Sequence, residues 1–252
     1  MLPKVLIPLN EEHLIRLGNN SDGGYIISKK IFEKCKTCLS FGLGDNFNFE
    51  QHLKEINPHV HVYMYDHTIN LHYFIKYFFY WLWHNIRYRR LNLRFMYYFR
   101  YHNFFLKKKK NFHIKEKVSA NNSLSKIIKT LNIDTNNTLL KVDIDGSEYE
   151  IIDEIKNYNF LCLIIEFEDA DKNIEKIVKF VEENKNLKII HLHANNFLPV
   201  GKNDIPKAIE ITFQNISFFK NQKLSNKNYP IPNLDFPNNQ MKEDIILKFS
   251  NN

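Results

Sequence analysis

Short apolar runs recur along this chain, and they alternate with stretches of helical periodicity. Apolar runs bounded by polar residues are typical of strands buried on both faces, whereas apolar residues three and four positions apart are typical of amphipathic helices. The strand pattern covers residues 37–41, 61–65, 139–144, 162–167, 187–191 and 208–213, with a further candidate at 112–118. The helical pattern covers 47–56, 123–131, 148–156 and 173–184. This alternation predicts an α/β fold: a doubly wound, mostly parallel sheet that binds ligands at the carboxyl ends of its strands.

Residues 70–111 depart from the alternation, because a simple crossover helix needs far fewer residues. The segment is crowded with aromatic residues, then with aromatic residues and arginines, and ends in the lysines at 107–110. One interpretation is a pair of amphipathic helices that pack on the core or on a second copy of the chain as a homo-oligomer. A second is a lid whose arginines hold the phosphates of a nucleotide-linked acceptor. A third is peripheral attachment to an anionic membrane face.

Length and charge narrow the class of protein. The 252 residues can bury one substantial core, so we expect a single domain over 1–252 that carries the insertion at 70–111. The sequence has no apolar run long enough to span a bilayer and no secretory leader, which predicts a cytoplasmic protein, with the inner membrane face as its site if the insertion binds lipid. Three cysteines cannot form a disulfide framework. The net charge of +7 permits nucleic-acid binding, but much of the excess lies in the insertion, so nucleic acid is not the favoured partner.

The first strand runs into a glycine turn that predicts a nucleotide-like cofactor. Gly42 and Gly44 allow a ligand to approach the backbone, and Asp66 follows the next strand, where an acidic residue binds ribose hydroxyls in doubly wound folds. A dinucleotide site would have a third glycine, where this chain has Phe47. The turn also contains Asp45, whose charge would repel a pyrophosphate but suits the cationic sulfonium and amino groups of S-adenosylmethionine. The sequence therefore favours S-adenosylmethionine over NAD.

A second strand ends in acidic residues at 141–148, where the sequence reads KVDIDGSE. Ser147 and Glu150 follow with the spacing of a helix capping box. Other segments that fit the same pattern follow in order along most of the chain, at 16–18, 22–25, 40–45, 65–68, 164–167, 191–196, 210–213 and 234–238. Together they resemble FkbM-like methyltransferases, whose motif is K-[IV]-D-[IV]-[DE]-G-x-E.

The resemblance implies a class I S-adenosylmethionine-dependent O-methyltransferase with a seven-stranded Rossmann-like sheet. It implies an acceptor that is a sugar hydroxyl, on a nucleotide-linked sugar used for capsule or other surface polysaccharide. The cofactor-binding residues that it implies are Gly42, Gly44 and Asp45 at the methionine end, Asp66 on the ribose, and Asp22 and Gly23 over the amino-acid portion. The family often has a histidine where this chain has Glu168.

Methyl transfer to a hydroxyl requires in-line alignment and removal of the hydroxyl proton. Asp143 lies at the end of its strand, and His193 is a histidine near the end of another, so both are candidate catalytic residues. Asp143, Glu166 and His193 are also a candidate site for Mg²⁺ or Mn²⁺, which would lower the pKa of the acceptor hydroxyl.

Other functions stay open at this point. A catalytically silent, membrane-associated interaction protein could keep the same fold, and an RNA methyltransferase could keep the same cofactor. An NAD-dependent oxidoreductase is less favoured, because the third glycine is missing.

Overall fold

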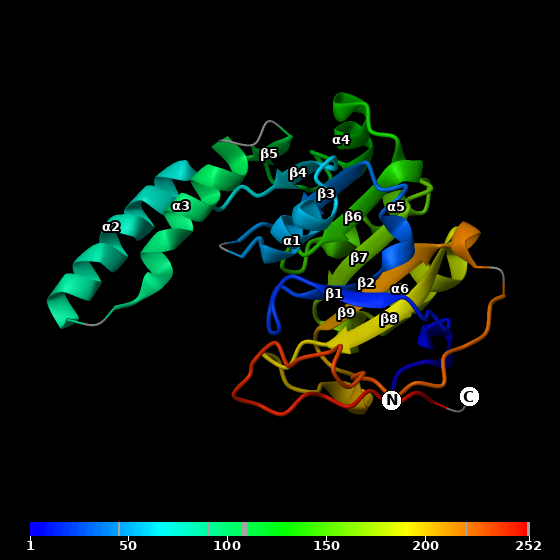
Figure 1. Ribbon diagram of the computed structural model, residues 1–252. Helices are drawn as coiled ribbons and strands as arrows, with labels where there is room; N and C mark the ends of the chain where they lie inside the picture. Colours follow the sequence, from blue (N-terminus) through cyan, green and yellow to red (C-terminus); the bar gives the residue numbers. More distant parts are fainter. Residues whose placement is uncertain (45, 90, 107–109, 220, 251–252) are drawn as a thin grey trace.

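The computed structural model describes residues 1–44, 46–89, 91–106, 110–219 and 221–250, and its centre is a seven-stranded sheet (Figure 1). Across the sheet the strands follow the order β5-β4-β3-β6-β7-β9-β8. Their bounds are β3 (Thr37–Phe41), β4 (His61–Tyr65), β5 (Asn111–Ile114), β6 (Thr138–Val142), β7 (Cys162–Phe167), β8 (Leu187–Ala194) and β9 (Ile209–Asn215). In this sheet β9 is antiparallel to its neighbours and the other pairs are parallel. The predicted Rossmann-like, mostly parallel α/β fold is confirmed.

The sheet is buried on both faces, which explains the uninterrupted apolar runs. Successive residues of a strand point to opposite faces, so Leu139 joins one hydrophobic core and Leu140 joins the other. The core around Leu140 includes residues of α4 (Leu124–Leu131), α5 (Ile152–Ile155) and α6 (Ala170–Glu183). The core around Leu139 includes residues of α1 (Asn48–Ile56). Helices on both faces leave the strand ends as the place for a ligand.

Several local predictions differ from the structure. The helix expected at 148–156 is broken into a 3-10 turn, η6 (Glu148–Glu150), and the single-turn α5. Ser147 does not cap it with its side chain, so the capping-box prediction is wrong. Nothing in the pattern predicted the antiparallel pair β1 (Leu14–Leu17) and β2 (Tyr25–Ser28).

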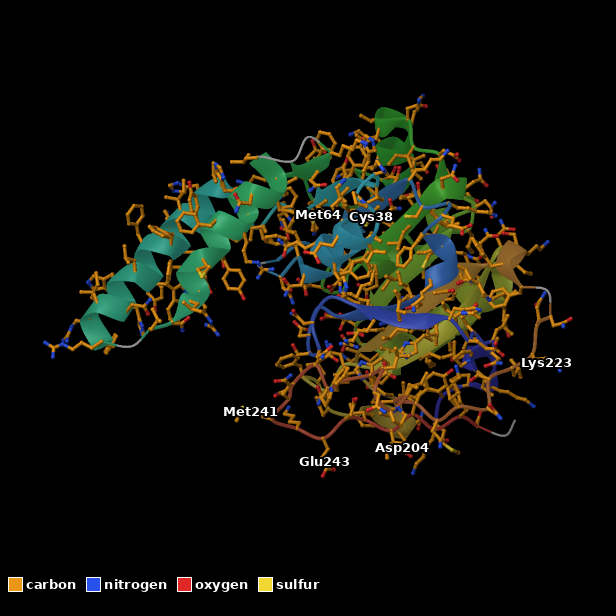
Figure 2. The ribbon with its side chains drawn as sticks, in the orientation of Figure 1. Cys38, Met64, Asp204, Lys223, Met241 and Glu243 are labelled. Carbon is orange, nitrogen blue, oxygen red and sulfur yellow. The ribbon has the colours of Figure 1, made fainter. Side chains whose placement is uncertain are left out.

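The insertion forms a helical arm that projects from the body (Figure 1). We use the term arm for the described residues of 71–106. Helix α2 (Leu71–Tyr88) leads outward, and η3 (Leu93–Met96), α3 (Tyr97–Tyr101) and a π-helix (His102–Leu106) lead back. The base of the arm packs on the body where the rings of Phe104 and Phe105 meet Phe47. Side chains stand out along both helices of the arm (Figure 2). Among the described helices none is long and apolar enough to cross a membrane.

Candidate active site

The glycine turn after β3 has a geometry that only glycine fits. Gly42 has a φ of +84°, and a Cβ there would lie 1.7 Å from the carbonyl oxygen of Asp143 on the neighbouring strand end. Gly44 also has a positive φ, of +54°. A side chain at Gly42 would therefore separate β3 from β6. Asp45, the turn carboxylate expected at the methionine end, lies outside the described residues.

Asp66, which directly follows β4, holds this turn in place through hydrogen bonds. Its Oδ2 accepts hydrogen bonds from the backbone N–H groups of Leu43 at 3.0 Å and Gly44 at 2.9 Å. Its Oδ1 accepts from the backbone N–H of Thr68 at 2.7 Å and from the Thr68 hydroxyl at 2.6 Å. Burial raises the pKa of Asp66, but these hydrogen bonds outweigh burial and hold the pKa below its usual value. The carboxylate thus shapes the turn, a role that the sequence did not reveal.

A cavity of about 400 Å³ opens at the carboxyl ends of β3, β4, β6 and β7. Its size is that of a small-molecule site. Seven carboxylate side chains line it, those of Asp22, Asp66, Glu116, Asp143, Asp145, Glu166 and Glu168. Among the described lining residues Lys117 is the one lysine or arginine.

This concentration of acid raises the proton affinity of the cavity wall. Burial raises the pKa values of Asp22, Asp145 and Glu168, and repulsion from neighbouring carboxylates raises them further. A positively charged ligand would relieve that repulsion. The electrostatics of the cavity therefore favour a cation over a pyrophosphate.

Asp143 is held in place from two sides. The hydroxyl of Tyr25 donates a 2.7 Å hydrogen bond to Oδ2 of Asp143, and Nζ of Lys141 lies 3.4 Å from the same oxygen. Lys141 is buried, which lowers its pKa, but the charges of Asp143 and Glu50 outweigh burial and raise it. Burial and the Asp143 charge raise the pKa of Tyr25 well above its usual value, so it remains a donor at neutral pH. Tyr25 belongs to the unpredicted β1–β2 pair, and the tyrosine in the matched segment at 22–25 was the one signal for it.

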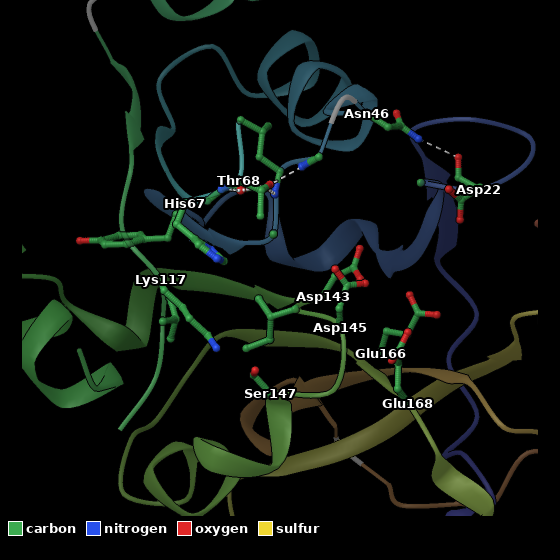
Figure 3. A pocket seen from close by; sticks show the side chains of 18 of the residues that line it. Asp22, Asn46, His67, Thr68, Lys117, Asp143, Asp145, Ser147, Glu166 and Glu168 are labelled. Atoms are coloured by element: carbon green, nitrogen blue, oxygen red, sulfur yellow. Dashed lines mark hydrogen bonds between the residues drawn. The ribbon is translucent and has the colours of Figure 1, made fainter. Parts of the chain in front are cut away.

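Glu166 lies beside Asp143 and Asp22 in the cavity wall (Figure 3). The side-chain amide of Asn195 donates a 2.8 Å hydrogen bond to its Oε1. Burial raises the pKa of Glu166 well above its usual value, and the charges of Asp143 and Glu210 add to this. Burial and the neighbouring carboxylates thus favour the protonated form of Glu166, which is poorly suited to bind a metal ion.

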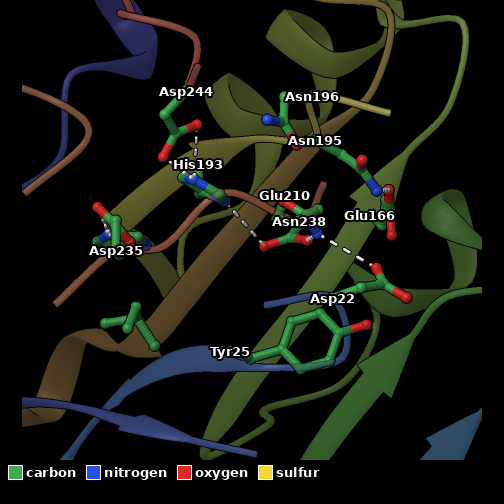
Figure 4. A network of polar contacts seen from close by, with 12 residues as sticks. Asp22, Tyr25, Glu166, His193, Asn195, Asn196, Glu210, Asp235, Asn238 and Asp244 are labelled. Atoms are coloured by element: carbon green, nitrogen blue, oxygen red, sulfur yellow. Dashed lines mark hydrogen bonds and ion pairs between the residues drawn. The ribbon is translucent and has the colours of Figure 1, made fainter. Parts of the chain in front are cut away.

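His193, the predicted base, does not line the cavity. Its Nε2 lies 3.0 Å from a carboxylate oxygen of Asp244, and its Nδ1 lies 3.5 Å from Glu210 (Figure 4). Burial lowers the pKa of His193, but the two carboxylates outweigh it and raise the pKa to about 10. A buried imidazolium cannot accept a proton at neutral pH, so the geometry gives no support to His193 as the base.

Instead, His193 joins the C-terminal segment to the sheet. Asn238 extends this network, because its side-chain amide donates to Glu210 at 2.8 Å and reaches Asp22 at 3.3 Å (Figure 4). The network thus runs from the buried ion pair to the rim of the cavity.

The structure also gives no support to the predicted Mg²⁺ or Mn²⁺ site. Asp143 pairs with Tyr25, Glu166 with Asn195, and His193 with carboxylates outside the cavity. Within the part of the chain that the structure describes, no group of three or more His, Cys, Asp and Glu residues could hold a metal ion.

Known proteins resemble this chain only weakly. No model of a protein family matches the chain, and no curated protein matches it. Three solved structures resemble it at low identity. Precorrin-6y C5,15-methyltransferase from Geobacter metallireducens GS-15 is 11% identical, with 73% of this chain and 85% of that chain covered and a TM-score of 0.38. A fibrillarin/Nop5p complex is 15% identical, with 72% of this chain and 73% of that chain covered and a TM-score of 0.41. M. jannaschii TYW2 in complex with AdoMet is 12% identical, with 82% of this chain and 89% of that chain covered and a TM-score of 0.35. Similarity this low carries no inference about activity.

Several of the predicted site residues lie together around the cavity. Of the predicted cofactor, catalytic and metal residues, those that line the cavity are Gly42, Gly44, Asp66, Asp22, Gly23, Asp143 and Glu166. Fold and site together define a Rossmann-like α/β domain with an acidic cavity at the strand ends.

Proposed function

We propose that this chain is an S-adenosylmethionine-dependent methyltransferase. The observation that carries the proposal is the cavity itself, in which a glycine turn held by Asp66 opens onto seven carboxylates. The sulfonium and amino groups of S-adenosylmethionine are positive, so they suit this wall. The pyrophosphate of NAD is negative and does not. The resemblance of the sequence to FkbM-like methyltransferases supports the same cofactor.

In this proposal the turn and the strand ends divide the cofactor between them. Gly42 and Gly44 give the ligand access to backbone, and Asp66 faces the ribose. Because Asp66 already accepts four hydrogen bonds, ribose hydroxyls would share its oxygens with the turn rather than meet a free carboxylate. Asp22 and Gly23 line the cavity, and we assign them to the amino-acid portion of the cofactor.

Asp143 is the residue that we assign to proton removal. S-adenosylmethionine supplies an electrophilic methyl group when bound, and the acceptor hydroxyl must lose its proton as the new bond forms. Asp143 lines the cavity, and Tyr25 and Lys141 fix the position of its carboxylate. That fixed position suits a base that must meet a hydroxyl in line with the methyl group.

For the acceptor we propose a sugar hydroxyl, on a nucleotide-linked sugar for surface polysaccharide. This finer step rests on the sequence resemblance. Lys117 adds one consideration, because it lies in the cavity wall, where its charge could meet a phosphate.

The first test is isothermal titration with S-adenosylhomocysteine, with NADH as the control ligand. Saturable binding of S-adenosylhomocysteine without binding of NADH is the expected result, and the reverse would overturn the proposal. Transfer of a radiolabelled methyl group to nucleotide sugars then tests the acceptor, with RNA as the competing substrate. Labelling of RNA alone would refute the sugar assignment and leave the cofactor assignment intact.

A further inference from the structure

The outward face of α2 carries a stripe of large apolar side chains in solvent. Phe79, Leu82, Trp83 and Ile86 have the spacing of one helical face. Their exposed fractions are 62%, 38%, 57% and 71%. We call these four residues the outer stripe.

The outer stripe is not needed to hold the arm together. The opposite face of α2 already packs on the returning segment, where the ring of Phe78 meets Phe95 and Tyr98. Asn85 adds two hydrogen bonds across the arm to the backbone of Asn92, at 2.8 and 2.9 Å. Both helices therefore have partners, and the outer stripe is surplus apolar surface of the kind that marks an interaction site.

The tip of the arm is also apolar, and cations surround it. Leu91 is 81% exposed and Leu93 is 57% exposed. Arg87 and Arg89 are exposed beside them. Exposed leucines close in sequence to exposed arginines are typical of a surface that meets the boundary between lipid headgroups and acyl chains.

The charge of the whole segment identifies the partner. Between Asp66 and Glu116 the sequence has no acidic residue, yet it has lysine or arginine at eleven positions. Since the net charge of the chain is +7, the remainder of the protein carries a net charge of −4. An anionic surface therefore attracts the segment between Asp66 and Glu116, which contains the arm, and repels the remainder of the chain.

Other partners fit this surface less well. The arm of a second copy would bring the same positive charge face to face with itself. A nucleic acid would attract the arginines and could stack bases on Phe79 and Trp83, but it would leave the aliphatic side chains of Leu82, Ile86 and Leu91 in water.

We propose that the outer stripe and the tip of the arm bind an anionic lipid surface. The arm would lie in the interface, because none of the described helices can span a bilayer. Helix α2, with 18 residues, is about 27 Å long, so contact along it can be extensive.

The attachment would also place the cavity near the lipid. His67 and Thr68 line the cavity, and α2 begins at Leu71. No described residue between 69 and 115 lines the cavity, so in this structure the arm does not cover it as a lid. The lipid proposal depends on the arm alone, so its test is independent of whether the chain transfers methyl groups.

Flotation with vesicles tests the proposal directly. The protein is mixed with vesicles of phosphatidylcholine alone, or of phosphatidylcholine with phosphatidylglycerol, and the bound fraction is measured at low and high salt. Trp83→Gln with Ile86→Gln removes apolar contact at exposed positions, and we expect it to weaken binding about tenfold or more. Arg87→Gln with Arg89→Asn should weaken binding to the anionic vesicles by roughly fivefold for each charge removed.

Matched controls remove equivalent groups from the body. Met241→Gln with Ile246→Gln removes two exposed apolar side chains, and Lys185→Gln with Lys223→Gln removes two exposed cations. Met241 and Lys223 lie on the body, away from the arm (Figure 2). Circular dichroism of every variant confirms that it has folded.

Salt-sensitive binding to the anionic vesicles that the arm variants lose and the controls keep would support the proposal. Equal binding of arm and control variants would overturn it. Binding to a short RNA without binding to vesicles would also overturn it. A dimer in light scattering that becomes a monomer on substitution of Trp83 and Ile86 would overturn it as well.

Discussion

Replacing Asp66 with alanine tests how far one carboxylate organises the cofactor site. The change removes the acceptor of four hydrogen bonds, from the N–H groups of Leu43, Gly44 and Thr68 and from the Thr68 hydroxyl. Leu43 is buried, so its N–H loses a partner that water cannot easily replace, at a cost of about 1–3 kcal/mol. Gly44 and Thr68 are exposed, and water can satisfy their donors.

The two consequences of Asp66→Ala can be measured separately. For a chain of this length the loss in folding free energy lowers the melting temperature by about 2–10 °C, which calorimetry measures. Loss of a charged acceptor for the ribose costs a further ~1.5–3 kcal/mol, which weakens S-adenosylhomocysteine binding about tenfold to hundredfold in isothermal titration. Glu243→Ala is the matched control, because Glu243 is exposed on the body, away from the arm (Figure 2).

The pH dependence gives a further check on Asp66. Its pKa is lowered in the folded state, so its stabilising contribution is present above the unfolded pKa and is lost as pH falls through the folded pKa. The alanine variant should lack that part of the acid destabilisation. Wild-type affinity for S-adenosylhomocysteine in a destabilised variant would show that Asp66 holds the turn without contacting the cofactor. If neither stability nor affinity changed, the account of the turn would be refuted.

Three further predictions concern the neighbours of this turn. Asp143→Asn should lower the rate of methyl transfer about 100-fold or more while S-adenosylhomocysteine affinity stays near that of the wild type; equal rates would remove Asp143 from the chemistry. Gly42→Ala should destabilise the protein by several kcal/mol in urea unfolding, because its Cβ would lie 1.7 Å from the Asp143 carbonyl oxygen. His193 has a pKa raised to about 10, so its contribution to stability is complete below about pH 6.5 and is lost as pH rises through 10. His193→Gln should cost about 3–5 kcal/mol at neutral pH and flatten the alkaline decline, whereas His59→Gln, at an exposed position, should do neither.

The site residues that the sequence predicted are those that directly follow a buried strand, because a local pattern is enough to identify such a strand. Gly42, Asp66 and Asp143 follow strands that read as buried, and parallel strands bring their carboxyl ends to one edge of the sheet. The meeting of strand ends at one edge does not determine the order of the strands across the sheet, or the distance between any two of them. His193 is on β8, which three strand spacings separate from β6 in the observed order, about 14 Å. The position of antiparallel β9 between β7 and β8 depends on long-range packing, so no local sequence pattern predicts it.

The site residues and contacts that the sequence did not predict lie in segments without a clear hydrophobic periodicity. The four-residue strands β1 and β2 are too short for a clear periodicity, yet their hairpin carries Asp22 and Tyr25 to the cavity. The pairing of His193 with Asp244 joins residues 51 positions apart in sequence, across a C-terminal segment with little regular structure. Such contacts follow from the tertiary fold, so sequence reading can name the residues but not their partners.

The charge of the cavity has a consequence for the order of binding. A nucleoside-diphosphate sugar is anionic, and the wall that it must approach carries seven carboxylates and one lysine among its described residues. Bound S-adenosylmethionine adds a net positive charge that its product, S-adenosylhomocysteine, lacks, so acceptor affinity should be higher with S-adenosylmethionine than with the product or for the free protein. One unit charge at about 8 Å changes the interaction by roughly 2 kcal/mol, or more than tenfold in affinity, at an effective dielectric constant near 20.

The Asp143→Asn variant allows this comparison, because slow turnover leaves S-adenosylmethionine intact while the acceptor is titrated. All three states are compared within that one variant, and a neutral monosaccharide serves as the control ligand whose affinity should not change. Lys117→Gln should weaken acceptor binding in every state and leave the advantage of the S-adenosylmethionine-bound state unchanged. If the sugar nucleotide binds equally well in all three states, the acceptor phosphates do not sense the cavity charge, and the acceptor then enters from a side that the carboxylates do not face.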